Sequence, residues 1–148
     1  MRSLKLLIFL VLVSFGQNGL ADEGYEWRAH PSVEKEFRDS PIVLVGKVIK
    51  AGNYLSKDSV DGTFYSVEVT ETLKGSPAKT LELYCENSSG RFPMEVGDSY
   101  LVFAYRGPFE GISGWRWAID SSGNSKQLDK AKSTLAQVRS LKRAARKS

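Results

Sequence analysis

Five short runs of β-branched, aromatic and aliphatic residues follow one another between residues 41 and 120, and turn-forming residues separate them. Runs of this length and spacing are typical of an all-β sandwich or barrel. Five strands fit a small closed barrel. We therefore predict a β-rich domain with strands at about 41–49, 63–73, 79–86, 99–105 and 115–120.

The alternation of side chains within these runs predicts which positions face a core. The run 99–105 is apolar in both phases, as expected of a strand that is covered on both sides. Gly46 suggests a bend or bulge in the first strand, and Asp61 with Gly62 predicts the turn that precedes the second. In the second strand, one phase is apolar and predicts the core face: Tyr65, Val67, Val69 and Leu73.

Helical spacing occurs only outside the strand region. Pro31 and Ser32 suit a helix start, and Val33 and Phe37 lie four residues apart on one face of the short helix that we expect within residues 27–40. A second, amphipathic helix is predicted at about 127–146, where apolar residues recur at steps of three and four. Its apolar stripe packs on the domain's own sheet, or it binds a membrane surface or a partner.

Residues 1–21 have the pattern of a signal peptide. Arg2 and Lys5 precede ten apolar residues, Leu6 to Phe15, and small residues precede a cleavage site near Ala21-Asp22. A helix needs about 20 apolar residues to span the membrane, so we expect cleavage and no stable membrane span. The prediction is a secreted or periplasmic single domain of residues 22–148.

Charge divides the chain into two parts. Residues 22–124 hold 11 basic and 16 acidic side chains, which gives −5, whereas residues 125–148 hold eight basic residues against Asp129 alone, which gives +7. The basic residues form the solvated face of the terminal helix, or they contact anionic lipid, an envelope polymer or an acidic partner. Export argues against nucleic acid as a partner.

The sequence offers no group of residues that would support catalysis. One Cys and one His exclude a disulfide framework and a Cys/His zinc site, so we predict no enzyme activity, no cofactor and no metal. Cys85 shares its phase with Leu81 and Leu83, which predicts a buried thiol rather than a partner for His30. Residues 120–124 favour a turn over a calcium loop because the later ligand positions are missing. Residues 87–89, Asn-Ser-Ser, match a glycosylation acceptor.

Aromatic and arginine residues gather near the last strand, and they form the candidate surface for a ligand or partner. Aromatic residues with arginine are the types that anchor protein hot spots and glycans. The alternative is that the two tryptophans fill the barrel and face the terminal helix, while Phe109 is exposed in either case. The candidate residues are Tyr105, Arg106, Phe109, Trp115, Arg116 and Trp117.

Four motifs occur in a fixed order: VGKVI (45–49), FYSVEVTETLKG (64–75), SSGRFPMEVGD (88–98) and SYLVFAY (99–105). Over about residues 37–120 the chain resembles the netrin-like OB-fold domain. Within that group it is most similar to the bacterial exported proteins that resemble tissue inhibitors of metalloproteinases. The resemblance implies a five-stranded Greek-key barrel, export and a binding role.

The chain departs from the animal inhibitors where they act. Their mature N-terminus is a cysteine that ligates the protease zinc, and disulfides tie that segment to the barrel. Here the predicted mature terminus is Asp22, and Ser89-Gly90 stands where relatives commonly have Cys-Gly. No inhibitory residue is therefore carried over by the resemblance.

These observations predict an exported, non-enzymatic binding protein that acts as a monomer on an exported or envelope protein. Two alternatives remain open at this point. One is a metalloprotease inhibitor that works through its N-terminal segment and loops, and the other is an envelope glycan-binding module.

Overall fold

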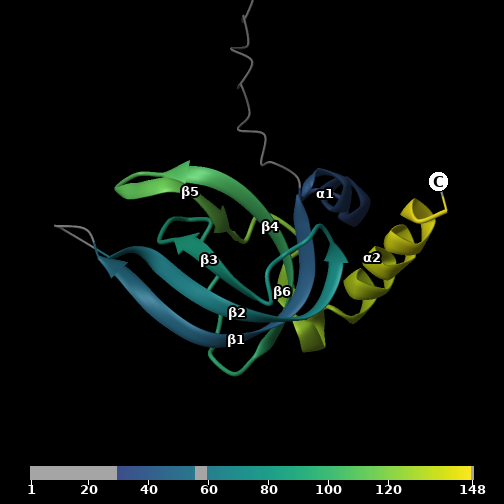
Figure 1. Cartoon of the computed structure of the whole chain (residues 1–148), viewed down its shortest axis with the longest axis horizontal. Coiled ribbons are helices and arrows are strands. Elements are labelled where there is room, and N and C mark those ends of the chain that lie inside the picture. Colours follow the sequence, from purple (N-terminus) through teal and green to yellow (C-terminus); the bar gives the residue numbers. More distant parts are fainter. Residues whose placement is uncertain (1–29, 56–59, 148) are drawn as a thin grey trace, which may run out of the picture.

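The computed structural model describes residues 30–55 and 60–147 (Figure 1). The predicted signal peptide and the predicted mature terminus lie outside these residues. The prediction of a β-rich fold with flanking helices is confirmed, with one six-stranded sheet. In chain order the elements are α1 (Val33–Asp39), β1 (Ile42–Leu55), β2 (Val60–Lys74), β3 (Thr80–Glu86), β4 (Ser99–Phe109), β5 (Ile112–Ala118), β6 (Lys126–Gln127), a 3₁₀ turn (Leu128–Lys130) and α2 (Lys132–Ala145).

The strands pair mainly in antiparallel fashion. β1 pairs with β2, β2 with β3, and β4 with β5, while β6 adds two residues to the edge of β4. β3 meets β5 in parallel through Tyr84 and Ala118. β1 also pairs with β4, from Ile42 opposite Ala104 to Lys47 opposite Ser99. Each of the strands β1, β2, β3 and β5 therefore has two neighbours in the sheet, and β4 has three.

The side-by-side strands β1 and β4 contribute side chains to two separate cores. Leu44 and Val102 belong to one core, which the strands enclose and which we call the core between the strands. Val45 and Leu101 belong to a second core beneath the helices, which we call the helix-side core. All four are no more than 5% exposed. This confirms that residues 100–104 of the predicted run 99–105 are covered on both sides, whereas Tyr105 at its end is 37% exposed.

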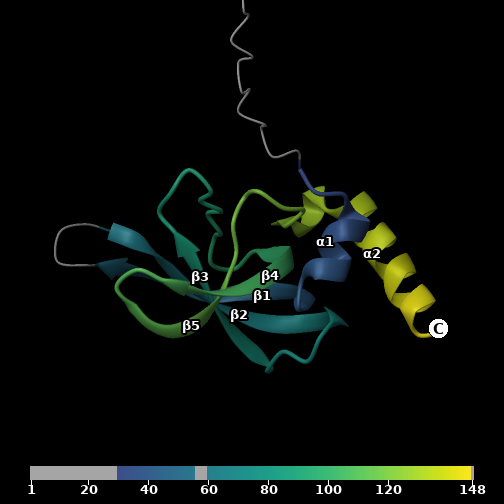
Figure 2. The ribbon, with the colours of Figure 1, turned by 90° about the horizontal axis from the view of Figure 1, so that it is seen from above.

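Both helices pack at one end of the molecule (Figures 1 and 2). Val138 of α2 is fully buried in the helix-side core with Phe37 of α1 and Leu73 of β2. The apolar stripe of α2 thus packs on the domain itself. No helix within the described ranges is long and apolar enough to cross a membrane.

Polar contacts fix the position of α1 at its two ends. Ser32 caps the start of the helix by accepting a hydrogen bond from the Lys35 amide (3.1 Å). At the other end, Lys74 Nζ donates to the carbonyl oxygens of Phe37 and Arg38, each at 2.7 Å. These carbonyls belong to the last turn, where a helix leaves acceptors unpaired and where positive charge is favourable.

Glu36 of α1 holds the segment that leads into β6. Its Oε2 accepts hydrogen bonds from the backbone amide and from the side-chain amide of Asn124, both at 2.6 Å. Gly123 lies beside it, and a Cβ there would overlap the Glu36 carboxylate, which would have to move. Glu36 therefore connects α1 to a segment 88 residues further along the chain.

Three sequence predictions need correction. Asp61 and Gly62 lie within β2 rather than in a turn, because the Tyr84 ring occupies the space where a Gly62 Cβ would be and its hydroxyl donates to the Asp61 carbonyl (2.8 Å). The residues between the strands predicted at 99–105 and 115–120 do not form a long loop. They include the ends of β4 and β5, joined by a tight turn at Gly111, whose φ is +73°. β1 continues to Leu55, since its exposed second half pairs with β2.

The bend predicted at Gly46 agrees with the structure. The β1–β2 register shifts between Val45 and Gly46. A Cβ at Gly46 would overlap Val67 Cγ1 and would lie 2.9 Å from the Glu68 carbonyl oxygen. Glycine is therefore the residue that lets β1 approach β2 closely at this bulge.

We predict that Glu36→Gln lowers the free energy of unfolding by roughly 1–3 kcal/mol, because a partly buried carboxylate that accepts two hydrogen bonds is replaced by a neutral amide. Denaturant unfolding measures the difference. The matched control is Glu34→Gln, an exposed position in the same first turn, which should change stability by less than about 0.5 kcal/mol. Equal losses in the two variants would contradict the role given to Glu36.

Candidate functional site

The hairpin of β4 and β5 carries all six residues of the candidate surface. Its register places Arg106 opposite Trp117 and Gly107 opposite Arg116. Directly opposite residues share a face, and neighbouring residues along a strand point to opposite faces. The six residues therefore divide into two sets: Arg106, Trp115 and Trp117 on one face, and Tyr105, Phe109 and Arg116 on the other.

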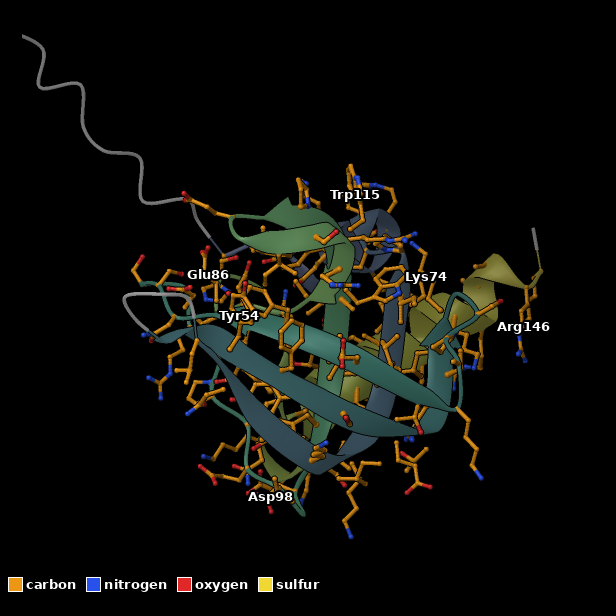
Figure 3. All side chains as sticks on the ribbon, turned by 60° about the vertical axis from the view of Figure 1, so that its left-hand side comes forward. Tyr54, Lys74, Glu86, Asp98, Trp115 and Arg146 are labelled. Carbon is orange, nitrogen blue, oxygen red and sulfur yellow. The ribbon has the colours of Figure 1, made fainter. Side chains whose placement is uncertain are left out.

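We call the first set the tryptophan face. The Arg106 guanidinium lies 5.6 Å from the centre of the Trp117 ring, within the range of a cation–π contact. Trp117 is half-buried and packs against the core between the strands. Trp115 is 60% exposed and points away from the body of the molecule (Figure 3). The face thus presents one exposed indole ring, Trp115, and an arginine that contacts the other indole ring, Trp117.

The alternative in which both tryptophans fill the interior and face α2 is wrong. The helix-side core, which α2 covers, includes neither residue. The pairing of β4 with β1 ends at Ala104, so the later residues of β4 are paired with β5 but not with β1. Trp117 is close enough to the base of this hairpin to reach the core, whereas Trp115, two residues nearer the tip, is not.

The opposite face of the hairpin contributes to an aromatic cluster, which we define as Tyr54, Phe64, Tyr84, Tyr105 and Phe109. Phe109 is not the exposed residue that the sequence predicted. It is half-buried, with its ring centre 4.8 Å from that of Tyr84 and 6.4 Å from that of Tyr105. Tyr54 contacts Tyr84 at 6.4 Å and donates a hydrogen bond to the Gly111 carbonyl (2.6 Å). The cluster joins the tip of the hairpin to β1.

Sequence reasoning missed three members of the cluster: Tyr54, Phe64 and Tyr84. Phe64 and Tyr84 are cross-strand partners on β2 and β3, with ring centres 5.0 Å apart. Both lie in the phase opposite the predicted core face of their strand. A large aromatic residue in an otherwise polar phase was the available signal, because such a residue is seldom left uncovered.

Burial and nearby carboxylates keep two tyrosines of this cluster, Tyr84 and Tyr105, protonated. Burial, helped by the nearby carboxylates of Glu86 and Asp61, raises the pKa of Tyr84 to about 12. Burial, together with the charge of Asp120 and a hydrogen bond to it, raises the pKa of Tyr105 even further. Neither phenol is suited to exchange protons near neutral pH. The cluster is a packing feature rather than a site of acid–base chemistry.

Cys85 is buried, as its phase predicted. It is 2% exposed within the core between the strands, and its sulfur accepts a hydrogen bond from the Phe92 amide (3.1 Å). Burial raises the pKa of the thiol, which keeps it in its unreactive form. His30, in contrast, is exposed. Within residues 30–55 and 60–147, no three His, Cys, Asp or Glu residues are grouped to hold a metal ion.

The turn predicted at 120–124 is present. Asp120 Oδ1 accepts hydrogen bonds from the Ser122 amide (2.8 Å) and from the Ser122 hydroxyl (2.5 Å). Asn124 is bound to Glu36 and to the Pro31 carbonyl. The polar side chains of this turn therefore have local partners.

A cavity of about 620 Å³ lies beside β6 and the start of β4. Two of its polar groups are already bound, because Gln127 Nε2 donates to Asp98 Oδ2 (2.8 Å) and the Tyr100 hydroxyl accepts from the Glu95 amide (2.9 Å). Its lining mixes both signs of charge with aromatic rings: Phe92, Pro93, Glu95, Asp98, Tyr100, Ser125, Lys126, Gln127 and Lys130.

The two tryptophans should respond differently to truncation. We predict that Trp117→Ala lowers the free energy of unfolding by about 2–3 kcal/mol, because it removes a ring that packs on the core. Trp115→Ala should change it by less than about 0.5 kcal/mol, because most of that ring is exposed. Denaturant unfolding monitored by far-UV circular dichroism tests both. A large loss in the Trp115 variant would contradict the exposed placement.

The raised pKa of Tyr84 predicts a loss of stability in alkali. The pKa of the Tyr84 phenol is about 10 in the unfolded chain and near 12 in the folded chain. The neutral phenol therefore stabilises the fold fully below pH 10, and this contribution is lost as the pH rises through 12. We expect Tyr84→Phe to cost about 1 kcal/mol at pH 8 through the lost bond to the Asp61 carbonyl. Its unfolding free energy should then fall less steeply than that of the wild type above pH 10. Parallel pH profiles would contradict the prediction.

No protein-family model matches the chain, and a search of curated proteins finds no match. Inferences about function therefore rest on the sequence and structure of this chain. Among them, the tryptophan face combines a large exposed ring with an oriented arginine on a paired hairpin.

Proposed function

We propose that this protein is an exported, non-enzymatic binding protein that recognises a protein partner through the tryptophan face. The observation that supports this most directly is the 60% exposure of Trp115, on the same face of the hairpin as the contact between Arg106 and Trp117. Tryptophan and arginine are the residues most enriched in binding hot spots. Covering the exposed part of the ring would contribute on the order of 3 kcal/mol to binding.

The surroundings of Trp115 favour recognition without rearrangement. Stacking on Trp117 already limits the rotamers of Arg106, so less side-chain entropy is lost when a partner binds. The hairpin is itself held at its tip by the hydrogen bond from Tyr54 to Gly111. A preorganised surface of this kind supports binding as the role of the protein.

We also propose that the sheet is an OB-type barrel of the netrin-like kind. Support comes from the strand neighbours, which run β1, β2, β3, β5, β4 and return to β1. The motif at 64–75, which ends in Leu-Lys-Gly, and the Gly-Asp-Ser-Tyr-Leu-Val-Phe-Ala motif at 97–104 add to it. Export is proposed on the leader at 1–21, and the binding site would then meet partners in the periplasm or outside the cell.

An envelope glycan is a second candidate ligand, because an exposed indole ring is a suitable platform for a sugar ring. The same residue carries both hypotheses, so the nature of the bound molecule must distinguish them. The hypothesis of a metalloprotease inhibitor acting through its N-terminus concerns residues outside the described part of the chain.

The proposed partner is tested by placing a photo-crosslinking amino acid at Ser113, an exposed position of β5 two residues before Trp115, in cells that export the full chain. We expect a discrete protein adduct, and we expect the Arg106→Ala substitution in the same chain to abolish it. Mass spectrometry of the exported chain should show Asp22 as its first residue.

The matched control places the same photoprobe at Val96, which is 58% exposed and lies on the loop before β4. It should give no such adduct. Identical adducts from both positions would refute a specific protein site on the tryptophan face. Retention of the chain on purified cell wall that Trp115→Ala abolishes, without any protein adduct, would favour the glycan instead.

A further inference from the structure

A groove lies between α1, α2 and the end of β2. It consists of two adjoining cavities of about 340 and 410 Å³, which share Phe37, Lys74 and Ala145 in their linings. Lys74 and Arg146 mark this region on the right of Figure 3, away from Trp115 at the top. The groove is therefore separate from the tryptophan face.

The floor of the groove is apolar and its rim is basic. Phe37 and Leu73 are the buried part of the floor, and Leu141 and Ala145 of α2 complete it. One acidic residue, Glu34, belongs to the lining. Four basic residues surround the floor: Arg38, Lys74, Lys142 and Arg146.

Two of the rim lysines are held in place by neutral acceptors. Lys74 Nζ donates to the Phe37 and Arg38 carbonyls and lies 5.5 Å from the Phe37 ring centre. Lys142 Nζ donates to the Thr72 carbonyl at 2.5 Å. Carbonyl oxygens orient an ammonium group but do not neutralise its charge. Because an ammonium has three N–H donors, each lysine keeps capacity for a further acceptor.

The carboxylates near the groove have other partners. Glu71 forms a two-bond salt bridge with Arg139, at 2.6 and 3.2 Å, and Arg139 is also the main cause of its lowered pKa, with a smaller effect from Lys142. Asp39 pairs with Lys35 at 2.6 Å and, at 3.4 Å, with the rim residue Arg38, whose charge it partly offsets. The rim therefore retains an excess of positive charge around an apolar floor.

We propose that this basic groove binds an acidic segment of a partner protein that also carries an apolar side chain. The apolar side chain would cover Phe37 and Leu141, and the carboxylates would meet Lys142 and Arg146. Charge complementarity identifies the class of partner, and the concave apolar floor selects a peptide over a simple anion. This site is independent of the proposed function of the tryptophan face.

The outer side of α2 argues against a membrane as the ligand. Its exposed positions between the basic residues are small or polar: Ser133, Ala136, Gln137, Ser140 and Ala144. A helix that binds a bilayer in its plane needs large apolar side chains on the face that enters the lipid. The large apolar residues of α2 are instead used in the helix-side core.

The test uses the protein as exported and a fluorescein-labelled peptide, Asp-Glu-Leu-Phe-Asp-Glu-Glu-Leu, followed by fluorescence anisotropy. We expect saturable binding that weakens as salt is raised. It should weaken about tenfold when the acidic residues of the peptide are replaced by their amides. Ala145→Trp, which fills the groove from an exposed position, should also abolish binding.

Charge reversal on α2 provides the matched pair of variants. Arg146→Glu at the rim should weaken peptide binding about tenfold, whereas Lys132→Glu, the same change in the first turn of the same helix, should alter it less than about twofold. Trp115→Ala should leave it unchanged, which separates this site from the tryptophan face. Equal effects of the two reversals, or binding that Ala145→Trp leaves intact, would overturn the proposal. The proposal would also be overturned if the protein showed no saturable peptide binding but bound vesicles of phosphatidylcholine and phosphatidylglycerol in a 7:3 ratio.

Discussion

The pairing of β1 with β4 is the constraint on which the rest of the structure depends. The two strands lie side by side between Ile42 and Lys47, and β1 is buried on both faces from Ile42 to Gly46. One face closes the core between the strands, and the other provides the surface on which α1 and α2 pack. Burial of backbone on both sides is favourable only when every amide is paired, which the continuous ladder of these two strands provides.

The two proposed binding surfaces follow from where this pairing begins and ends. Beyond Ala104, β4 loses β1 as a neighbour, and the hairpin that continues from it presents Trp115. Ahead of Ile42, the chain forms α1, which Lys74 ties to the end of β2 beside the basic groove. The two surfaces thus lie at opposite ends of the β1–β4 pairing, and a partner bound to one surface would leave the other accessible.

Much of the fold could be predicted from the sequence. Apolar and polar residues alternate along a strand that has one face exposed to solvent, so the apolar phase identifies the buried face. Cys85 and Leu83 were assigned to the core on this basis, and the helix start at Ser32 followed from capping chemistry. The candidate surface was located on the correct hairpin. Its division into two faces was not predicted, because that depends on the register of β4 with β5. The aromatic cluster was missed because Tyr84 is covered by residues distant in sequence, which periodicity cannot reveal.

Cys85 can report local opening of this fold. It is the single thiol of the chain, and it lies in the core between the strands with its sulfur bonded to the Phe92 amide. Because Cys85 is only 2% exposed, its alkylation under native conditions should be slow and should speed up when β3 and the loop behind it open. The protein can therefore be followed through folding, ligand binding and mutation without an added label.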